Sequence, residues 1–71
     1  MSTGVVKWFN PSIGYGFIMG FDGAEIYFHC SSIAEAGGGA GWSTGTRVDF
    51  DVIQTRTGFE ATNVICSALS P

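Results

Sequence analysis

The side chains best suited to catalysis or metal binding are those of His29, Cys30 and Cys66. His29 is the only histidine, and neither cysteine belongs to a CxxC pair. A structural zinc ion takes four Cys or His ligands, so we expect no metal site and no cofactor. A lone imidazole without a nucleophile or metal partner makes no catalytic constellation, so we do not expect an enzyme. Two cysteines are fewer than a disulfide-stabilised domain of this size usually carries, and we expect both thiols to be reduced.

A second group of side chains could bind a ligand without doing any chemistry on it. The segment IGYGFIMGFDGAEIYFHC, residues 13–30, holds five aromatic residues and the histidine. Every nucleobase has a flat face, and stacking one base on an aromatic ring contributes about 1–3 kcal/mol. Rings that lie together on the protein surface would therefore suit unpaired bases. The elements that carry the rings decide whether they do so.

The elements that position these rings are predicted to be short β-strands rather than helices. Eleven glycines and two prolines in 71 residues favour strands and turns. We predict strands over residues 3–10, 15–20, 25–31, 46–53 and 59–66. Turns are expected at 10–14, at Asp22–Gly23 and at 54–58, with a glycine-rich loop over 34–41. The pattern predicts an all-β fold, a small five-stranded antiparallel barrel, formed by a single domain over residues 1–71 with its core in 3–66.

Two assignments of the strand faces are open, because alternate residues of a strand point to opposite sides. The first leaves Tyr15, Phe17, Tyr27 and His29 outside. Its predicted core consists of Val6, Ile18, Ile26, Phe28, Ile33, Val48, Phe50, Val52 and Val64. The reverse would bury two phenols and an imidazole, each of which would need a hydrogen-bond partner. We therefore expect the first assignment, which leaves an exposed aromatic patch of the kind that marks a binding surface.

The overall charge is an argument against a nucleic-acid binder. The net charge is −3, and the only Lys and Arg residues are Lys7, Arg47 and Arg56. Affinity for phosphate normally comes from these two residue types. The objection weakens if Lys7 and Arg56 lie beside the rings while Asp49 and Asp51 project from another face, because local charge governs contact with phosphate.

Two sequence features bear on where the protein works. No apolar run approaches the roughly 20 residues that a membrane span needs. The opening MSTGVVKW lacks the basic and long apolar regions of a signal peptide. We therefore expect a cytoplasmic protein with no membrane contact, and we expect it to be a monomer.

The aromatic motifs resemble those of a known family. GYGFI (14–18) is similar to the first RNA-binding signature of cold-shock domains, K-G-F/Y-G-F-I/V, and IYFHC (26–30) is similar to the second, V-F-V-H-F. With GVVKWFN ahead and EATNV behind, the chain resembles the cold-shock domain family over roughly residues 3–66. The resemblance implies a five-stranded OB-type barrel that binds single-stranded RNA or DNA, with an RNA chaperone as the expected activity.

The resemblance also implies roles for individual residues. Lys7 matches a phosphate-binding lysine, Trp8 a base-stacking tryptophan and Asn10 a contact to a base edge. The central stacking platform would consist of Tyr15, Phe17, Tyr27 and His29. Trp42 stands where the family has a loop phenylalanine, and Arg56 could reach the nucleic-acid backbone. Phe59 replaces a frequent proline and could add a ring beside Arg56, whereas Phe9 is expected to be partly buried.

Several positions depart from the family pattern. Ile13 stands where the family has a lysine, so one phosphate contact is missing, and Cys30 replaces the last aromatic residue of the second signature. The loop over 34–41 is longer and richer in glycine than usual.

A protein-interaction barrel that uses the same rings to bind a peptide is the alternative function, since proline-rich peptides dock in aromatic grooves.

Overall fold

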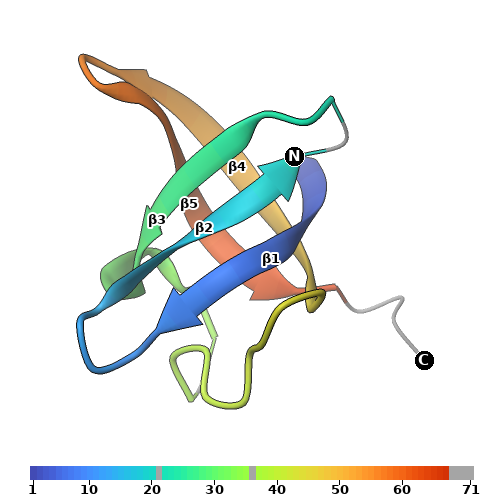
Figure 1. Ribbon diagram of the computed structural model, residues 1–71, viewed down its shortest axis with the longest axis vertical. Helices are drawn as coiled ribbons and strands as arrows, with labels where there is room; N and C mark the ends of the chain where they lie inside the picture. Colours follow the sequence, from blue (N-terminus) through green and yellow to red (C-terminus); the bar gives the residue numbers. More distant parts are fainter. Residues whose placement is uncertain (21, 36, 68–71) are drawn as a thin grey trace.

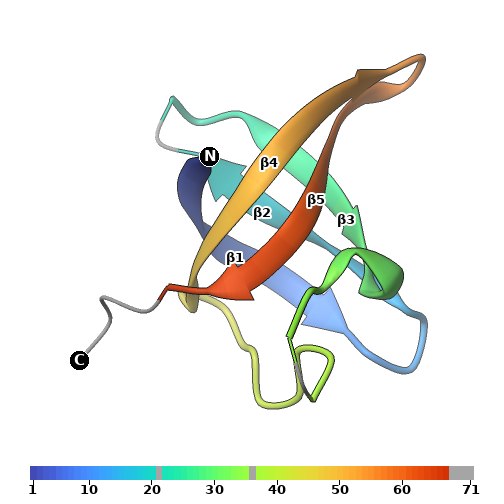
Figure 2. The same cartoon turned by 180° about the vertical axis from the view of Figure 1, so that it is seen from behind.

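The computed structural model describes residues 1–20, 22–35 and 37–67. Phe21 and Ala36, which belong to the aromatic segment and to the glycine-rich loop, lie outside this part. The strands are β1 (Ser2–Asn10), β2 (Tyr15–Gly20), β3 (Glu25–His29), β4 (Arg47–Thr55) and β5 (Gly58–Cys66), with a 3-10 turn, η1 (Cys30–Ser32), after β3. They close into a barrel in the order β1-β2-β3-β5-β4 (Figures 1 and 2). The predicted five-stranded barrel is confirmed.

The barrel is antiparallel at every seam except one. β3 and β5 run parallel and pair only through Tyr27 and Glu60, so this one seam departs from the antiparallel pairing that was predicted. A single isolated bridge between Ile33 and Val64 extends the contact beyond β3. Closure through so few backbone pairs makes the β3–β5 seam the weakest in hydrogen bonding.

The buried residues confirm the predicted face assignment, although two of the nine predicted core residues are not buried. The core consists of Val6, Ile18, Ile26, Phe28, Val48, Phe50, Ala61 and Val64. Ile33, which was predicted in the core, packs against it while only partly buried. Val52 was predicted in the core but is 39% exposed. Its strand partner is Ala61, which is buried.

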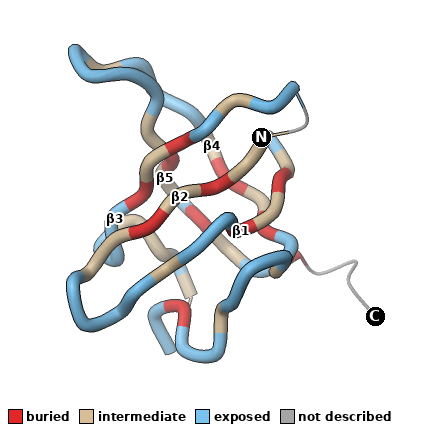
Figure 3. Tube along the Cα trace, viewed as in Figure 1, coloured by how far each residue is buried: buried red, intermediate tan, exposed pale blue. Residues whose placement is uncertain are grey.

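Val52 is exposed because the β4–β5 hairpin is longer than predicted. The first residue of β1, Ser2, pairs with Phe50, so the part of β4 beyond Phe50 has no β1 neighbour. The predicted turn at 54–58 shrinks to Arg56 and Thr57, since the strands continue to Thr55 and resume at Gly58. The hairpin therefore projects past the end of the barrel, and its tip is exposed (Figure 3).

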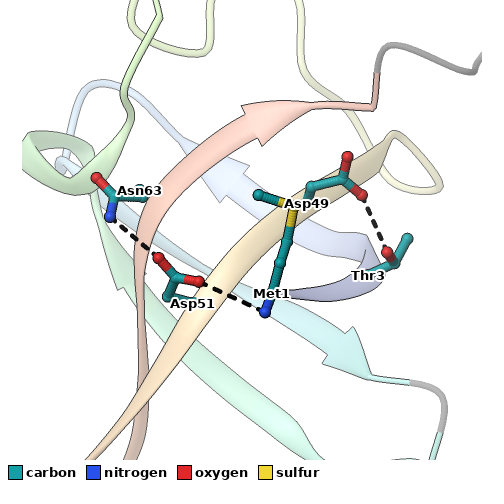
Figure 4. Close-up of polar contacts among 5 residues, drawn as sticks. All are labelled: Met1, Thr3, Asp49, Asp51 and Asn63. Atoms are coloured by element: carbon teal, nitrogen blue, oxygen red, sulfur yellow. Dashed lines mark hydrogen bonds and ion pairs between the residues drawn. The ribbon is translucent and has the colours of Figure 1, made fainter.

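The acidic residues of β4 lie on the side of the barrel away from β2 and β3 (Figure 4). Asp49 Oδ1 accepts a hydrogen bond of 3.0 Å from Thr3 Oγ1 of β1. Asp51 Oδ2 accepts one of 3.1 Å from Asn63 Nδ2, and its Oδ1 lies 3.8 Å from the amino group of Met1. Asn63 has a φ of 51° at a register shift in β5, which marks a bulge. The predicted separation of these carboxylates from the ring face is confirmed.

Candidate nucleic-acid interface

A bulge in β1 determines which side of the barrel Trp8 faces. Val6 pairs with Ile18, but Trp8, two residues later, pairs with Phe17, only one residue away on β2. β1 therefore contains one extra residue, Lys7, and a bulge of this kind redirects the side chains that follow. In a regular strand Trp8 would share the inner face with buried Val6. With the bulge, Trp8 lies outside, and Phe9 takes the inner position.

Four rings from three strands form one contiguous surface, which we call the ring platform: Trp8, Tyr15, Phe17 and Tyr27. Trp8 contacts Tyr15 and Phe17 with ring centroids 5.5 Å apart in each case. Tyr27 contacts Tyr15 at 5.7 Å and Phe17 at 5.8 Å. The planes are tilted or edge-to-face rather than parallel. Each ring supports two others, so the platform is ordered by its own contacts while its outer faces remain partly open.

Gly16 sets the spacing of the strands beneath the ring platform. A Cβ atom at this position would lie 2.2 Å from the carbonyl oxygen of Trp8 and 2.8 Å from Cα of Phe9. Real Cβ atoms do not approach backbone this closely, so only glycine fits between Tyr15 and Phe17. The Y-G-F spacing therefore combines two outward rings with a position where β1 and β2 come close.

His29 lies at one end of the platform, where it is the cross-strand partner of Tyr15. Its Nδ1 accepts a hydrogen bond of 3.1 Å from the backbone N–H of Ser31 and lies 2.9 Å from the Ser31 hydroxyl. The side chain thus caps η1 and ends β3 two residues before the predicted end. Because Nδ1 is an acceptor, the proton of the neutral imidazole is on Nε2. His29 therefore offers an N–H donor that a base edge could use.

Asn10 is the neighbour of Tyr15 on β1 and begins the β1–β2 turn. Its Oδ1 accepts a hydrogen bond of 2.9 Å from the backbone N–H of Ser12. Its backbone carbonyl accepts the N–H of Gly14 at 2.9 Å. The oxygen end of the side chain is therefore used to shape the turn, and the amide NH₂ is the end that could contact a base. Asn10, Tyr15 and His29 form one row across the sheet.

Trp42 and Phe9 pack at the end of the barrel that carries the β1–β2 turn rather than on the ring platform. Phe9 stacks on the buried ring of Phe28 at 5.3 Å, which confirms its expected partial burial. Trp42 is also partly buried, with centroid distances of 6.3 Å to Phe9 and 6.2 Å to Phe28. Gly39, which is buried with a φ of +84°, lies between these side chains and Ile33. The loop tryptophan therefore contributes to the core, a role that the resemblance did not indicate.

Arg56 and Phe59 belong to the projecting β4–β5 hairpin. Arg56 is exposed in its turn. Phe59 is 48% exposed and lines a hollow of about 570 Å³ at the barrel end, together with Phe50, Val52 and Ile26. Among the described residues Phe59 makes no ring contact with the platform, so the structure does not make this predicted site residue part of it.

Two acidic residues next to the platform were missed by sequence reasoning. Lys7 Nζ forms an ion pair with Glu25, and Glu60 is the strand partner of Tyr27. Lys7 is the extra residue of the β1 bulge, and the Glu60–Tyr27 pair depends on the parallel seam. Neither register can be read from a single sequence, although the opposite charges of Lys7 and Glu25 on predicted outer faces were a usable signal.

The described residues offer little for other kinds of site. They contain no group of three or more His, Cys, Asp or Glu side chains placed to hold a metal ion. Cys30 and Cys66 are both exposed free thiols. No helix within this part of the chain is long and apolar enough to cross a membrane. The ring platform is therefore the candidate functional site.

Comparison with known proteins agrees with the motifs. A family model described as the 'Cold-shock' DNA-binding domain matches residues 2–67. Cold shock protein 1 of Lactiplantibacillus plantarum is 42% identical over 65 residues, which cover 92% of this chain and 97% of that protein. Cold shock protein CspC of Bacillus subtilis is 41% identical over 64 residues, covering 90% and 96%. Cold shock protein CspB of Bacillus caldolyticus is 38% identical over 68 residues, covering 92% and 97%.

Proposed function

Because the chain belongs to the cold-shock domain family over residues 2–67, we propose that it binds single-stranded RNA or DNA on the ring platform and acts as an RNA chaperone. The observation that supports this most directly is the set of mutual contacts among Trp8, Tyr15, Phe17 and Tyr27 on the outer face of β1–β3. The core is complete without them. Their exposure therefore has a functional rather than a packing explanation.

Binding by stacking explains how such a protein could act without catalysis. An unpaired base can rotate out and lie on a ring, whereas the faces of a paired base are covered by its neighbours. A protein that binds only the open strand shifts the equilibrium between paired and unpaired forms toward the unpaired form. On this proposal the protein works as a cytoplasmic monomer and uses neither metal nor cofactor.

The polar groups around the platform complement this role. The amide NH₂ of Asn10 and the Nε2–H of His29 would contact base edges at one end. Lys7, which directly precedes Trp8, would contact a phosphate, and Arg56 would meet the backbone of a longer strand at the hairpin. With so few cations, stacking supplies more of the affinity than charge does.

Tryptophan fluorescence tests this function directly. A Trp42→Phe variant leaves Trp8 as the only tryptophan, so its emission reports contact at the platform. We expect single strands of about six or seven nucleotides to quench it, within the site size typical of one OB barrel. A duplex of the same length is the control. Equal affinity for the duplex and the single strand would contradict stacking of splayed bases.

A further inference from the structure

We propose that Glu25 is a specificity-determining residue that competes with nucleic-acid phosphate for Lys7. The carboxylate holds the ammonium group in the free protein, and a phosphate must displace it. The inference rests on the proposed function and concerns the same site. Its consequence is that a ligand must bring bases for the rings, because phosphate alone gains little from this surface.

The ion pair crosses the middle strand of the platform. Lys7 is the extra residue of the β1 bulge, and Glu25 is the first residue of β3. Met19 of β2 is the strand partner of both Val5 and Glu25, so it lies between the two charged elements. Lys7 Nζ donates a hydrogen bond to Glu25 Oε2 across the outer side of this strand. Glu25 is two residues before Tyr27 and thus shares the outer face with the ring platform.

The charges around the rings make this pair important. The only Lys and Arg residues of the chain are Lys7, Arg47 and Arg56, and of these only Lys7 lies on the ring-bearing strands β1–β3. Glu25 neutralises it, and Glu60 lies beside Tyr27 on the other side of the rings. A phosphate that approaches the platform therefore meets two carboxylates and one cation that is already paired.

The pair is weak enough to be exchanged. Its side chains are 46% and 48% exposed, for Lys7 and Glu25 respectively, and exposed pairs of this type contribute little net stability because water and salt screen them. When a phosphate binds Lys7, the nucleic acid releases one counterion. The carboxylate of Glu25 loses its partner at the same time and attracts a cation from solution. The salt dependence of binding is then smaller than one phosphate contact would normally give. Repelling an unwanted class of ligand in this way is a recognised route to specificity.

The experiment compares Glu25→Gln with Glu60→Gln, a matched control. Both variants remove one negative charge beside Tyr27 and keep the shape of the side chain, but of these two carboxylates only Glu25 forms an ion pair within the described residues. Binding of a seven-nucleotide oligothymidylate is measured from about 50 to 200 mM salt. Each variant is also made in a Lys7→Gln background. Competition by inorganic polyphosphate, a polyanion without bases, is measured for each protein.

We expect Glu25→Gln to steepen the slope of log affinity against log salt by about 0.7, the value of one phosphate contact on a single strand. Between 50 and 200 mM salt, this steeper slope corresponds to an additional loss of affinity of about threefold. Polyphosphate should displace the oligonucleotide more effectively from Glu25→Gln than from the wild type. Glu60→Gln should leave the slope unchanged, and so should Glu25→Gln when it is made in the Lys7→Gln background.

Two failures can be told apart. In the first, the wild type binds the oligonucleotide, but Glu25→Gln and Glu60→Gln change the salt slope equally, or Glu25→Gln still steepens the slope in the Lys7→Gln background. Glu25 then acts only as part of the general negative charge, and the inference is wrong. If neither the wild type nor any variant binds single strands at the lowest salt, the proposed function itself is wrong, and the inference is lost with it.

Discussion

Trp8 lies directly opposite Phe17, with ring centroids 5.5 Å apart, because Lys7 is an extra residue in β1. Without this bulge Trp8 would point into the barrel beside Val6. Lys7, the extra residue itself, forms an ion pair with Glu25 across β2. One inserted residue thus accompanies both an outward ring and a charge next to it, so on the proposed function the bulge helps to form the binding surface.

The first prediction concerns the two faces of the central hairpin. Phe17→Ala and Tyr27→Ala should each weaken single-strand binding by about 1–3 kcal/mol, the value of one stacked base. Both rings are only partly buried on the outer face, so the melting temperature should change little. Oligonucleotide titrations and thermal melts of the same samples measure the two effects.

Phe28→Ala is the control from the opposite face. Phe28 is 0% exposed and belongs to the core. Removing its ring should destabilise the domain by about 3–5 kcal/mol, which is enough to unfold so small a protein. If Phe17→Ala unfolded the chain while Phe28→Ala were harmless, the functional assignment of the faces would be reversed.

The second prediction separates packing from binding at Trp42. Trp42 packs on Phe9 and Phe28, although the family resemblance implies a ligand contact there. Trp42→Ala should therefore lower the free energy of unfolding by about 0.5–3 kcal/mol, the range of most destabilising point mutations. Its effect on affinity, measured well below the melting temperature, should be smaller than that of Phe17→Ala. A normal melt combined with a large loss of affinity would show that the loop ring acts on the ligand.

Most of the fold could be predicted because alternation of apolar and polar residues is a local signal. Ile18, Ile26 and Phe28 alternate with Phe17, Tyr27 and His29, and burial of the first set follows from the cost of burying polar groups. This local pattern gave the faces of β2 and β3 and therefore three of the four platform rings. The predicted strand bounds lie within two residues of the observed ones at every end.

The errors arise where geometry depends on distant partners. Val52 has the pattern of a core residue, but β1 begins too late to cover it. The position of the Trp8 ring came from the family resemblance, since regular alternation with Val6 would have buried it. The parallel pairing of Tyr27 with Glu60 and the packing of Trp42 on Phe28 likewise join segments far apart in the chain. No local pattern encodes such contacts.

The last prediction concerns Ile13, which stands where the family has a lysine. Ile13 does not pack inward to close the barrel end, because its side chain is 53% exposed in the β1–β2 turn between Asn10 and Tyr15. A lysine there can meet a phosphate beside the ring platform. Ile13→Lys should strengthen binding at low salt and steepen the salt slope by about 0.7, with an unchanged melting temperature. Val52→Lys is the matched control, since Val52 is also an exposed β-branched residue but lines the barrel-end hollow. Equal steepening by both variants would mean that only net charge matters and that position 13 does not contact the ligand.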